Sequence, residues 1–135
     1  MSGAEEALES AMLAAIAADA GVQAKLGSPV RIEEEGGPRP AFPYLELVRQ
    51  ESGPADAAGV EASTHLVDLA VVSRVASGRE AVAAMAEVRR ALNDAALAMA
   101  GWRCVLLAPV FFGAARTRPW LWRATLRVKA VVEKV

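Results

Sequence analysis

Few side chains in this sequence are of the types that carry out catalysis. The chain contains one histidine, His65, and one cysteine, Cys104, and it has neither a glycine-rich phosphate-binding loop nor a cluster of metal ligands at a known spacing. Within a predicted strand, His65 shares a face with Val67 and Leu69, whereas Asp68 points to the opposite face. The carboxylate of Asp68 therefore does not orient the imidazole as a general base requires, and we expect His65 to be structural.

The remaining reactive groups also favour structural interpretations. Cys104 lies in an apolar stretch and is expected to be an inert packed thiol, and a single cysteine excludes an internal disulfide. Glu33, Glu34 and Glu35 could together bind a cation, but a run of acids is more often a solvated edge that blocks strand pairing. We therefore predict no enzyme, no catalytic residue, no cofactor and no metal site.

Aromatic and basic residues gather near the C-terminus: Trp120, Trp122, Arg116, Arg118 and Arg123. Such a mixture is found in proteins that bind single-stranded nucleic acids. Strand alternation, however, predicts both tryptophans on one buried face and the arginines on the exposed one. The net charge of −1 is also far from the strongly basic balance of a dedicated nucleic-acid binder. A protein interface, where arginine is enriched, is the favoured use of these cations.

The elements that carry these residues are predicted to be two helices and four or five strands. The first half begins with a helix capped by Ser2 and Glu5 that runs through Ile16, followed by a short turn capped by Asp19, strands 30–34 and 44–50, and a flexible arm from Glu51 to Ser63. The second half begins with a strand 64–75 and a helix capped by Ser77 that ends in 98–101. A strand 103–112, a turn 116–119 and a strand 120–134 complete the chain. This order predicts an α+β fold with two helices on one face of a mainly antiparallel sheet of about four to five strands.

Alternation and helical periodicity predict the inward positions of the two longest strands and of the second helix. They are Val67, Leu69, Val71 and Val75 in the strand 64–75, alternate residues from Trp120 to Val132 in the strand 120–134, including Leu126 and Val128, and the stripe Ala81, Met85, Val88, Leu92 and Ala95 in the helix.

Length and composition agree with one globular domain over residues 1–135. The chain is 54% hydrophobic and 23% charged, which excludes a disordered tail and a membrane protein on composition alone. The N-terminus is acidic where a signal peptide would be basic. The longest apolar run, Val105 to Ala115, is interrupted by Pro109 and is shorter than the about 20 residues needed to cross a bilayer. We therefore expect a cytosolic protein.

Charge is distributed unevenly along the chain. From Gly101 onward there are seven basic residues and one acid, so this part carries +6 and the first hundred residues carry −7. Opposite charges at the two ends of a chain can attract neighbouring copies. The sequence therefore indicates self-association.

The full pattern resembles the small tail-completion or tail-terminator proteins of long-tailed phages, including those of gene transfer agents. The resemblance rests on the apolar turn from Asp19 to Gly27, the proline-rich approach to the strand Phe42–Leu47, a helix with Ala81, Ala84, Val88, Ala91 and Leu92, and a long closing strand. The run Glu33–Glu35 departs from it, since a small or polar turn is expected there. The resemblance covers nearly the full length but includes no invariant motif.

The resemblance implies a structural role without catalysis. Such proteins form a ring, typically sixfold, at the head-proximal end of the tail tube, where they stop tube polymerisation and provide the surface that joins the head. The implied partners are further copies of the chain, the tail tube protein and the head connector or stopper protein. DNA would only pass through the lumen, and no membrane is involved. The implied location is the bacterial cytoplasm during assembly and then the neck of a released particle.

Two alternatives stay open at this point. One is a head–tail connector, a stopper or a minor tail subunit of similar size. The other, from a different class, is a small-molecule-binding regulatory α+β domain with an apolar pocket lined by Trp102 or Phe111. A ligand-dependent shift in thermal stability would favour this second class.

The candidate interface residues are charged and lie on predicted strands, edges and loops: Glu33, Glu34, Arg39, Glu51, Asp56, Glu61, Arg116, Arg118, Arg123, Arg127 and Lys129. The arm from Glu51 to Ser63 and the proline-rich segment from Gly36 to Pro43 are expected to order when they meet a tube, connector or neighbouring subunit.

Overall fold

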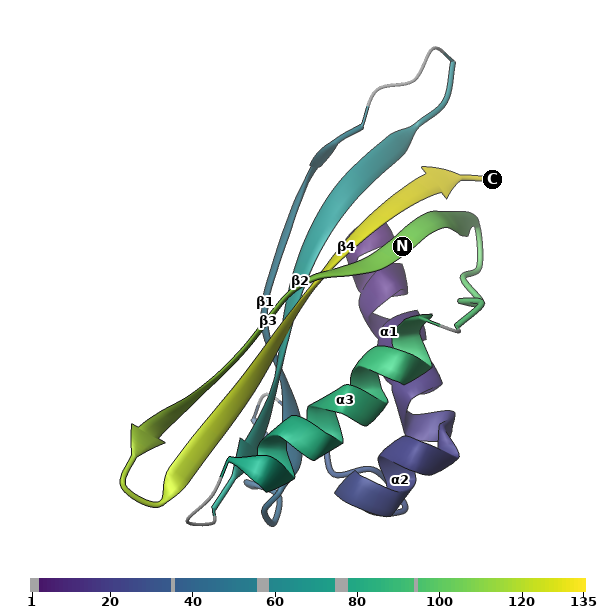
Figure 1. The fold of residues 1–135 in the computed structure, drawn as a ribbon. Helices are drawn as coiled ribbons and strands as arrows, with labels where there is room; N and C mark the ends of the chain where they lie inside the picture. The colour runs from purple at the N-terminus through teal and green to yellow at the C-terminus, as the bar shows by residue number, and fades with distance from the viewer. Residues whose placement is uncertain (1–2, 35, 56–58, 75–77, 94) are drawn as a thin grey trace.

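The computed structural model describes residues 3–34, 36–55, 59–74, 78–93 and 95–135. Within these ranges the chain forms three helices and one four-stranded antiparallel sheet (Figure 1). The elements are α1 (Ala4–Ala18), α2 (Ala20–Leu26), β1 (Tyr44–Pro54), β2 (Ala62–Ser73), α3 (Arg79–Asn93), β3 (Trp102–Arg118) and β4 (Leu121–Lys134). The strand order is β1-β2-β4-β3, so β1 and β3 are the edges. The predicted α+β fold is confirmed, and the short turn expected after Asp19 is a helix of its own.

The core lies between the helices and the two central strands. Leu69 of β2 pairs with Leu126 of β4, and both side chains are fully buried. Alternate residues on these strands point the same way, and the predicted inward positions of β4 from Ala124 to Val132 are all buried. The predicted inward positions of β2 that the structure describes are buried as well, whereas Val75 lies outside the described residues. The predicted stripe of α3 is also confirmed, because Met85 and Val88 are fully buried against the same face.

A cap on α2 fixes how the helices meet. The carboxylate of Asp19 accepts a hydrogen bond from the backbone N–H of Val22 at 3.0 Å, as predicted for a helix-capping residue. The same carboxylate pairs with Arg90 of α3 at 2.5 Å. Asp19 therefore joins α2 to α3.

The predicted strand 30–34 is wrong. Ile32 makes only an isolated parallel bridge to Leu45 of β1, with hydrogen bonds from Leu45 N–H to the Arg31 carbonyl and from Glu33 N–H to the Leu45 carbonyl. A parallel ladder needs a long crossover between its strands. The short proline-rich connection into β1 does not provide one, so the pairing stops after one bridge.

The predicted flexible arm from Glu51 to Ser63 is largely a β-ribbon. β1 and β2 stay paired up to Pro54 opposite Ser63, and the N–H of Ala55 donates to the carbonyl of Ala62 at 3.0 Å. The segment lacks hydrophobic periodicity, but a hairpin ladder is held by backbone hydrogen bonds, which need no apolar side chains. Figure 1 shows this ribbon projecting beyond the helices.

Two predicted boundaries were also wrong, the start of α1 and the end of α3. α1 begins at Ala4 with Gly3 in the capping position and no side-chain cap, while Ser2 and Ser77 lie outside the described residues. α3 ends at Asn93 instead of near residue 101. The alanine-rich segment after it has helical propensity, but Leu97 and Met99 pack on the core outside any helix, so tertiary packing overrides propensity.

The hairpin of β3 and β4 is longer than predicted. Arg116 still pairs with Trp122 and Arg118 with Leu121, so the turn comes after the predicted 116–119 segment begins. Register shifts at three points along β3, one of them beside Pro109, absorb the residues that cannot follow a regular ladder. β3 is therefore a long, irregular edge strand.

Candidate functional site

The face of the sheet opposite the helices carries two of the predicted interface arginines. Arg127 donates from its guanidinium to both carboxylate oxygens of Asp68 on β2, at 2.9 and 3.2 Å. Arg123 pairs with Glu46 of β1. Arg127 thus links the neighbouring strands β4 and β2, and Arg123 reaches across β2 to the edge strand β1. Lys129 is exposed on β4.

A carboxylate cluster lies where this face meets the segment before β1. Desolvation raises the pKa of Glu46, Arg123 opposes this effect, and a hydrogen bond with Glu33 raises the pKa further. Burial and the charge of Glu33 also raise the pKa of the Tyr44 phenol. Glu33 itself is half-buried, so it is not part of a fully solvated acidic run.

The tip of the β3–β4 hairpin carries exposed basic and aromatic groups. The guanidinium of Arg116 lies 5.4 Å from the centre of the Trp122 ring. The side chain of Arg118 is exposed and makes no hydrogen bond or ion pair within the described part of the chain. The prediction that both tryptophans are buried on one face is wrong for Trp120, which is 53% exposed because it stands in the turn before β4.

The other predicted interface residues are scattered. Glu34 and Arg39 are exposed before β1, Glu51 pairs with Arg49, and Glu61 lies 3.7 Å from Lys134. Asp56 lies outside the described residues. The predicted charged set therefore occupies the open sheet face, the β3–β4 tip, the segment before β1 and the β1–β2 ribbon, and it forms no single cluster.

His65 and Cys104 occupy packed positions. His65 is fully buried, its Nε2 lies 2.8 Å from the Ser63 hydroxyl, and its Nδ1 has no partner among the described atoms. Burial lowers the pKa of His65, which favours the neutral imidazole. Burial also raises the pKa of the Cys104 thiol, so the nucleophilic thiolate is disfavoured.

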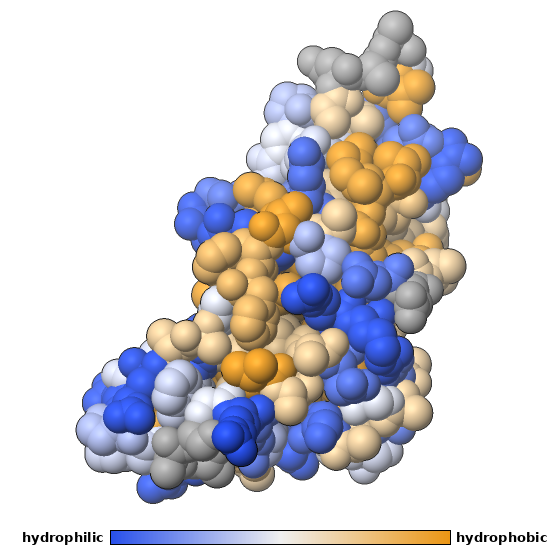
Figure 2. All heavy atoms as spheres, in the orientation of Figure 1, coloured by the Kyte–Doolittle hydropathy of each residue, from blue (hydrophilic) through white to orange (hydrophobic). Residues whose placement is uncertain are grey.

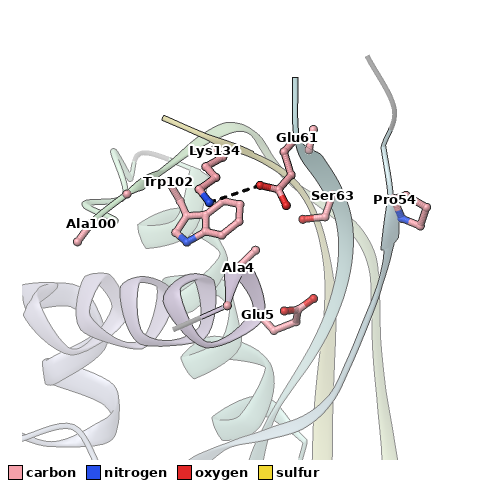
Figure 3. Close-up of a pocket in the computed structure, with 11 residues that line it drawn as sticks. Ala4, Glu5, Pro54, Glu61, Ser63, Ala100, Trp102 and Lys134 are labelled. Atoms are coloured by element: carbon pink, nitrogen blue, oxygen red, sulfur yellow. Dashed lines mark ion pairs between the residues drawn. The ribbon is translucent and has the colours of Figure 1, made fainter. Parts of the chain in front are cut away.

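An open pocket of about 670 Å³ lies beside the N-terminal end of α1 (Figure 3). Trp102 and Lys134 form one wall, where the ammonium lies 5.9 Å from the indole centre and pairs with Glu61. The two charged side chains neutralise each other and are mainly exposed, whereas a small-molecule site normally has polar groups that converge in an enclosed cavity. Phe111 lines a separate hollow of about 320 Å³ with Phe112 and Arg89.

The described ranges also lack two other kinds of site. No group of three or more His, Cys, Asp or Glu side chains there is placed to hold a metal ion. No described helix is long and apolar enough to cross a membrane.

The feature that sequence reasoning missed is the apolar surface of β3. Val105 is 51% exposed, Leu106 42%, Val110 52% and Phe111 55%, and Figure 2 shows apolar side chains running down the visible face toward a more hydrophilic lower end. Large exposed apolar groups in one contiguous strand mark an interaction surface more often than a free one. The signal was present, since the run Val105–Ala115 is apolar on both alternating faces, whereas a half-exposed edge strand should alternate with polar residues.

Comparisons with known proteins agree with this picture of an assembling structural protein. The family of tail completion protein gp17 matches residues 10–133. A chain from the virion of a native gene transfer agent particle has a similar structure, with a TM-score of 0.86 and 27% sequence identity over 98% of this chain and 99% of that one. No curated protein sequence matches significantly. The chain therefore belongs to the tail completion protein gp17 family of virion structural proteins.

Proposed function

We propose that this chain forms an oligomeric ring, most simply a hexamer, on the head-proximal end of a long tail tube. There it would stop tube polymerisation and present the surface that joins the head connector or stopper protein. Membership of a tail completion family over residues 10–133 is the observation that carries this proposal. The full-length similarity to a chain of a gene transfer agent virion supports it, because the whole chain matches and not an isolated motif.

The physical features of the chain fit a role in assembly. A single domain with an exposed apolar edge strand and cations at one tip is suited to repeated contacts between copies. The scattered charged residues Glu34, Arg39, Glu61 and Arg118 would then meet tube, connector or neighbouring subunits. Assembly would take place in the bacterial cytoplasm, and the protein would remain in the neck of the released particle with DNA passing through its lumen.

Deleting the gene in the bacterium that encodes it tests this function. We expect tails of irregular length that are not joined to heads, visible by negative-stain electron microscopy, and restoration of both by the wild-type gene. Tails of normal length that lack heads would instead indicate a connector or stopper role. Normal particles without this protein would refute a role in tail completion.

A further inference from the structure

We call four exposed apolar side chains of the edge strand β3 the β3 patch; they are Val105, Leu106, Val110 and Phe111. Each of these side chains is between 42% and 55% exposed. The ring of Phe111 rests over Gly113, where an added Cβ would lie 3.0 Å from the ring. Gly113 therefore leaves room for an aromatic ring to lie on the strand surface, at the C-terminal end of the patch.

A partner that covers this patch does not do so by pairing a strand of its own with the edge of β3. β3 is an edge strand, but it contains register shifts near Cys104, Pro109 and Arg116, and Pro109 has no N–H to donate. Bulges and proline are the devices by which edge strands avoid continuous pairing with another strand. A partner must therefore be held by the side chains of the patch.

A complementary surface lies elsewhere on the same chain, along the N-terminal half of α1. A hollow of about 380 Å³ there is lined mainly by small side chains, with Ala7, Ala11 and Ala14 on α1 and Met99 opposite them. Glu6 stands at its edge, exposed and without a partner in the described ranges. This surface offers space for large apolar side chains and a negative charge beside it.

The charges of the two surfaces are opposite. Arg116 and Arg118 follow the β3 patch at the hairpin tip, whereas the first turns of α1 carry Glu5, Glu6 and Glu9 and no basic residue. The tip lies at the lower end of the view in Figure 1, well away from the start of α1. Opposite charges on separate surfaces of one chain favour contact between two copies and disfavour contact of either surface with itself.

We infer that the β3 patch and basic tip of one copy pack against the N-terminal half of α1 in a second copy. Since the two contacting surfaces differ, the contact is head-to-tail, and a head-to-tail contact closes into a ring when its rotation closes. The inference rests on the proposed ring and names the surfaces that would build it.

Sedimentation velocity over a range of concentrations tests the apolar half of the contact. Wild-type protein should form species larger than a dimer, and V110T/F111T should need at least about tenfold more protein to assemble, as expected when central apolar contacts are removed. Val82 of α3 is 38% exposed outside the patch, so V82T is the matched control and should assemble like wild type. None of these side chains belongs to the buried core, so all variants should remain folded as monomers, which thermal unfolding checks.

Charge reversal tests the pairing of the two surfaces. E6K and R118E should each assemble several-fold more weakly than wild type, and an equal mixture of the two should recover, because each variant then meets a partner of opposite charge at both surfaces. A wild-type chain that stays monomeric at its highest soluble concentration, a V110T/F111T chain that assembles normally, or a mixture without recovery would each overturn the inference. The proposed function is judged separately, by the tails of the deletion strain.

Discussion

Among the described glycines, Gly78 has the tightest contact with a rigid side chain, the Trp122 ring. Gly78 lies directly before α3, and its carbonyl accepts a hydrogen bond from the N–H of Val82 at 3.0 Å. A Cβ at this position would lie 2.7, 2.9 and 3.0 Å from three carbons of the Trp122 ring. The ring is half-buried against the core and is also stacked on by Arg116. G78A therefore forces either the start of α3 or the indole to move.

The expected loss follows from two opposing effects. Overpacking a filled site costs about 1–3 kcal/mol. Replacing glycine by alanine returns about 0.4–1 kcal/mol by restricting the unfolded chain, where the backbone conformation is compatible, and Gly78 has no positive φ. The net decrease in the free energy of unfolding should be about 1–2 kcal/mol. For a domain of this size that decrease lowers the melting temperature by roughly 3–10 °C.

Urea denaturation followed by circular dichroism measures this difference. The matched control is G53A, because an added Cβ at Gly53 meets nothing within 4 Å, and this variant should be as stable as wild type or slightly more stable. In W122L the large ring is gone, so G78A should cost about 1 kcal/mol less in that background than in wild type. A G78A protein as stable as wild type, or a cost unchanged by W122L, would refute the steric reasoning.

Two further predictions concern titratable groups. Burial lowers the pKa of His65 below the unfolded value of 6.5, so the unfolded state takes up a proton first as the pH falls. The free energy of unfolding should therefore decrease below about pH 6.5, by at most about 1.4 kcal/mol per pH unit. Urea titrations of H65Q should show a flatter dependence of this free energy on pH, and equal slopes for H65Q and wild type would contradict the prediction. D19A should lower the free energy of unfolding by about 1–2 kcal/mol, because it removes the hydrogen bond that caps α2 at Val22 and the ion pair with Arg90. E87A removes only a surface ion pair and should lower it by less than half as much. Equal losses in the two variants would show that the cap contributes nothing.

Local patterns predicted the central elements because their causes are local. Asp19 is a capping residue wherever a helix starts after it, and it caps α2. The alternation in β4 needs only a strand with one buried face, and Leu126 and Val128 are buried as predicted. The predicted apolar stripe of α3 is likewise buried, as at Met85. The edges were predicted poorly, because pairing at an edge depends on where a distant strand ends.

The candidate site shows the same division. Sequence reasoning selected charged residues for an interface, yet Arg123 and Arg127 are paired inside the chain with Glu46 and Asp68. That pairing depends on the order β1-β2-β4, which brings together residues far apart in the sequence. The apolar residues of β3 were not predicted as an interface, because an apolar strand is expected to be buried until its place at the edge of the sheet is known.

The sequence by itself determined the α+β class, the inward faces of β2, β4 and α3, and a resemblance to tail-completion proteins that the family match confirms. Periodicity, capping and composition act within a few residues, so they can be read along the chain. Only the tertiary structure decided that β3 is an edge strand with Val110 and Phe111 exposed, and that the basic tip lies away from the acidic start of α1. Exposure depends on which elements cover a strand, and that is a property of the whole fold.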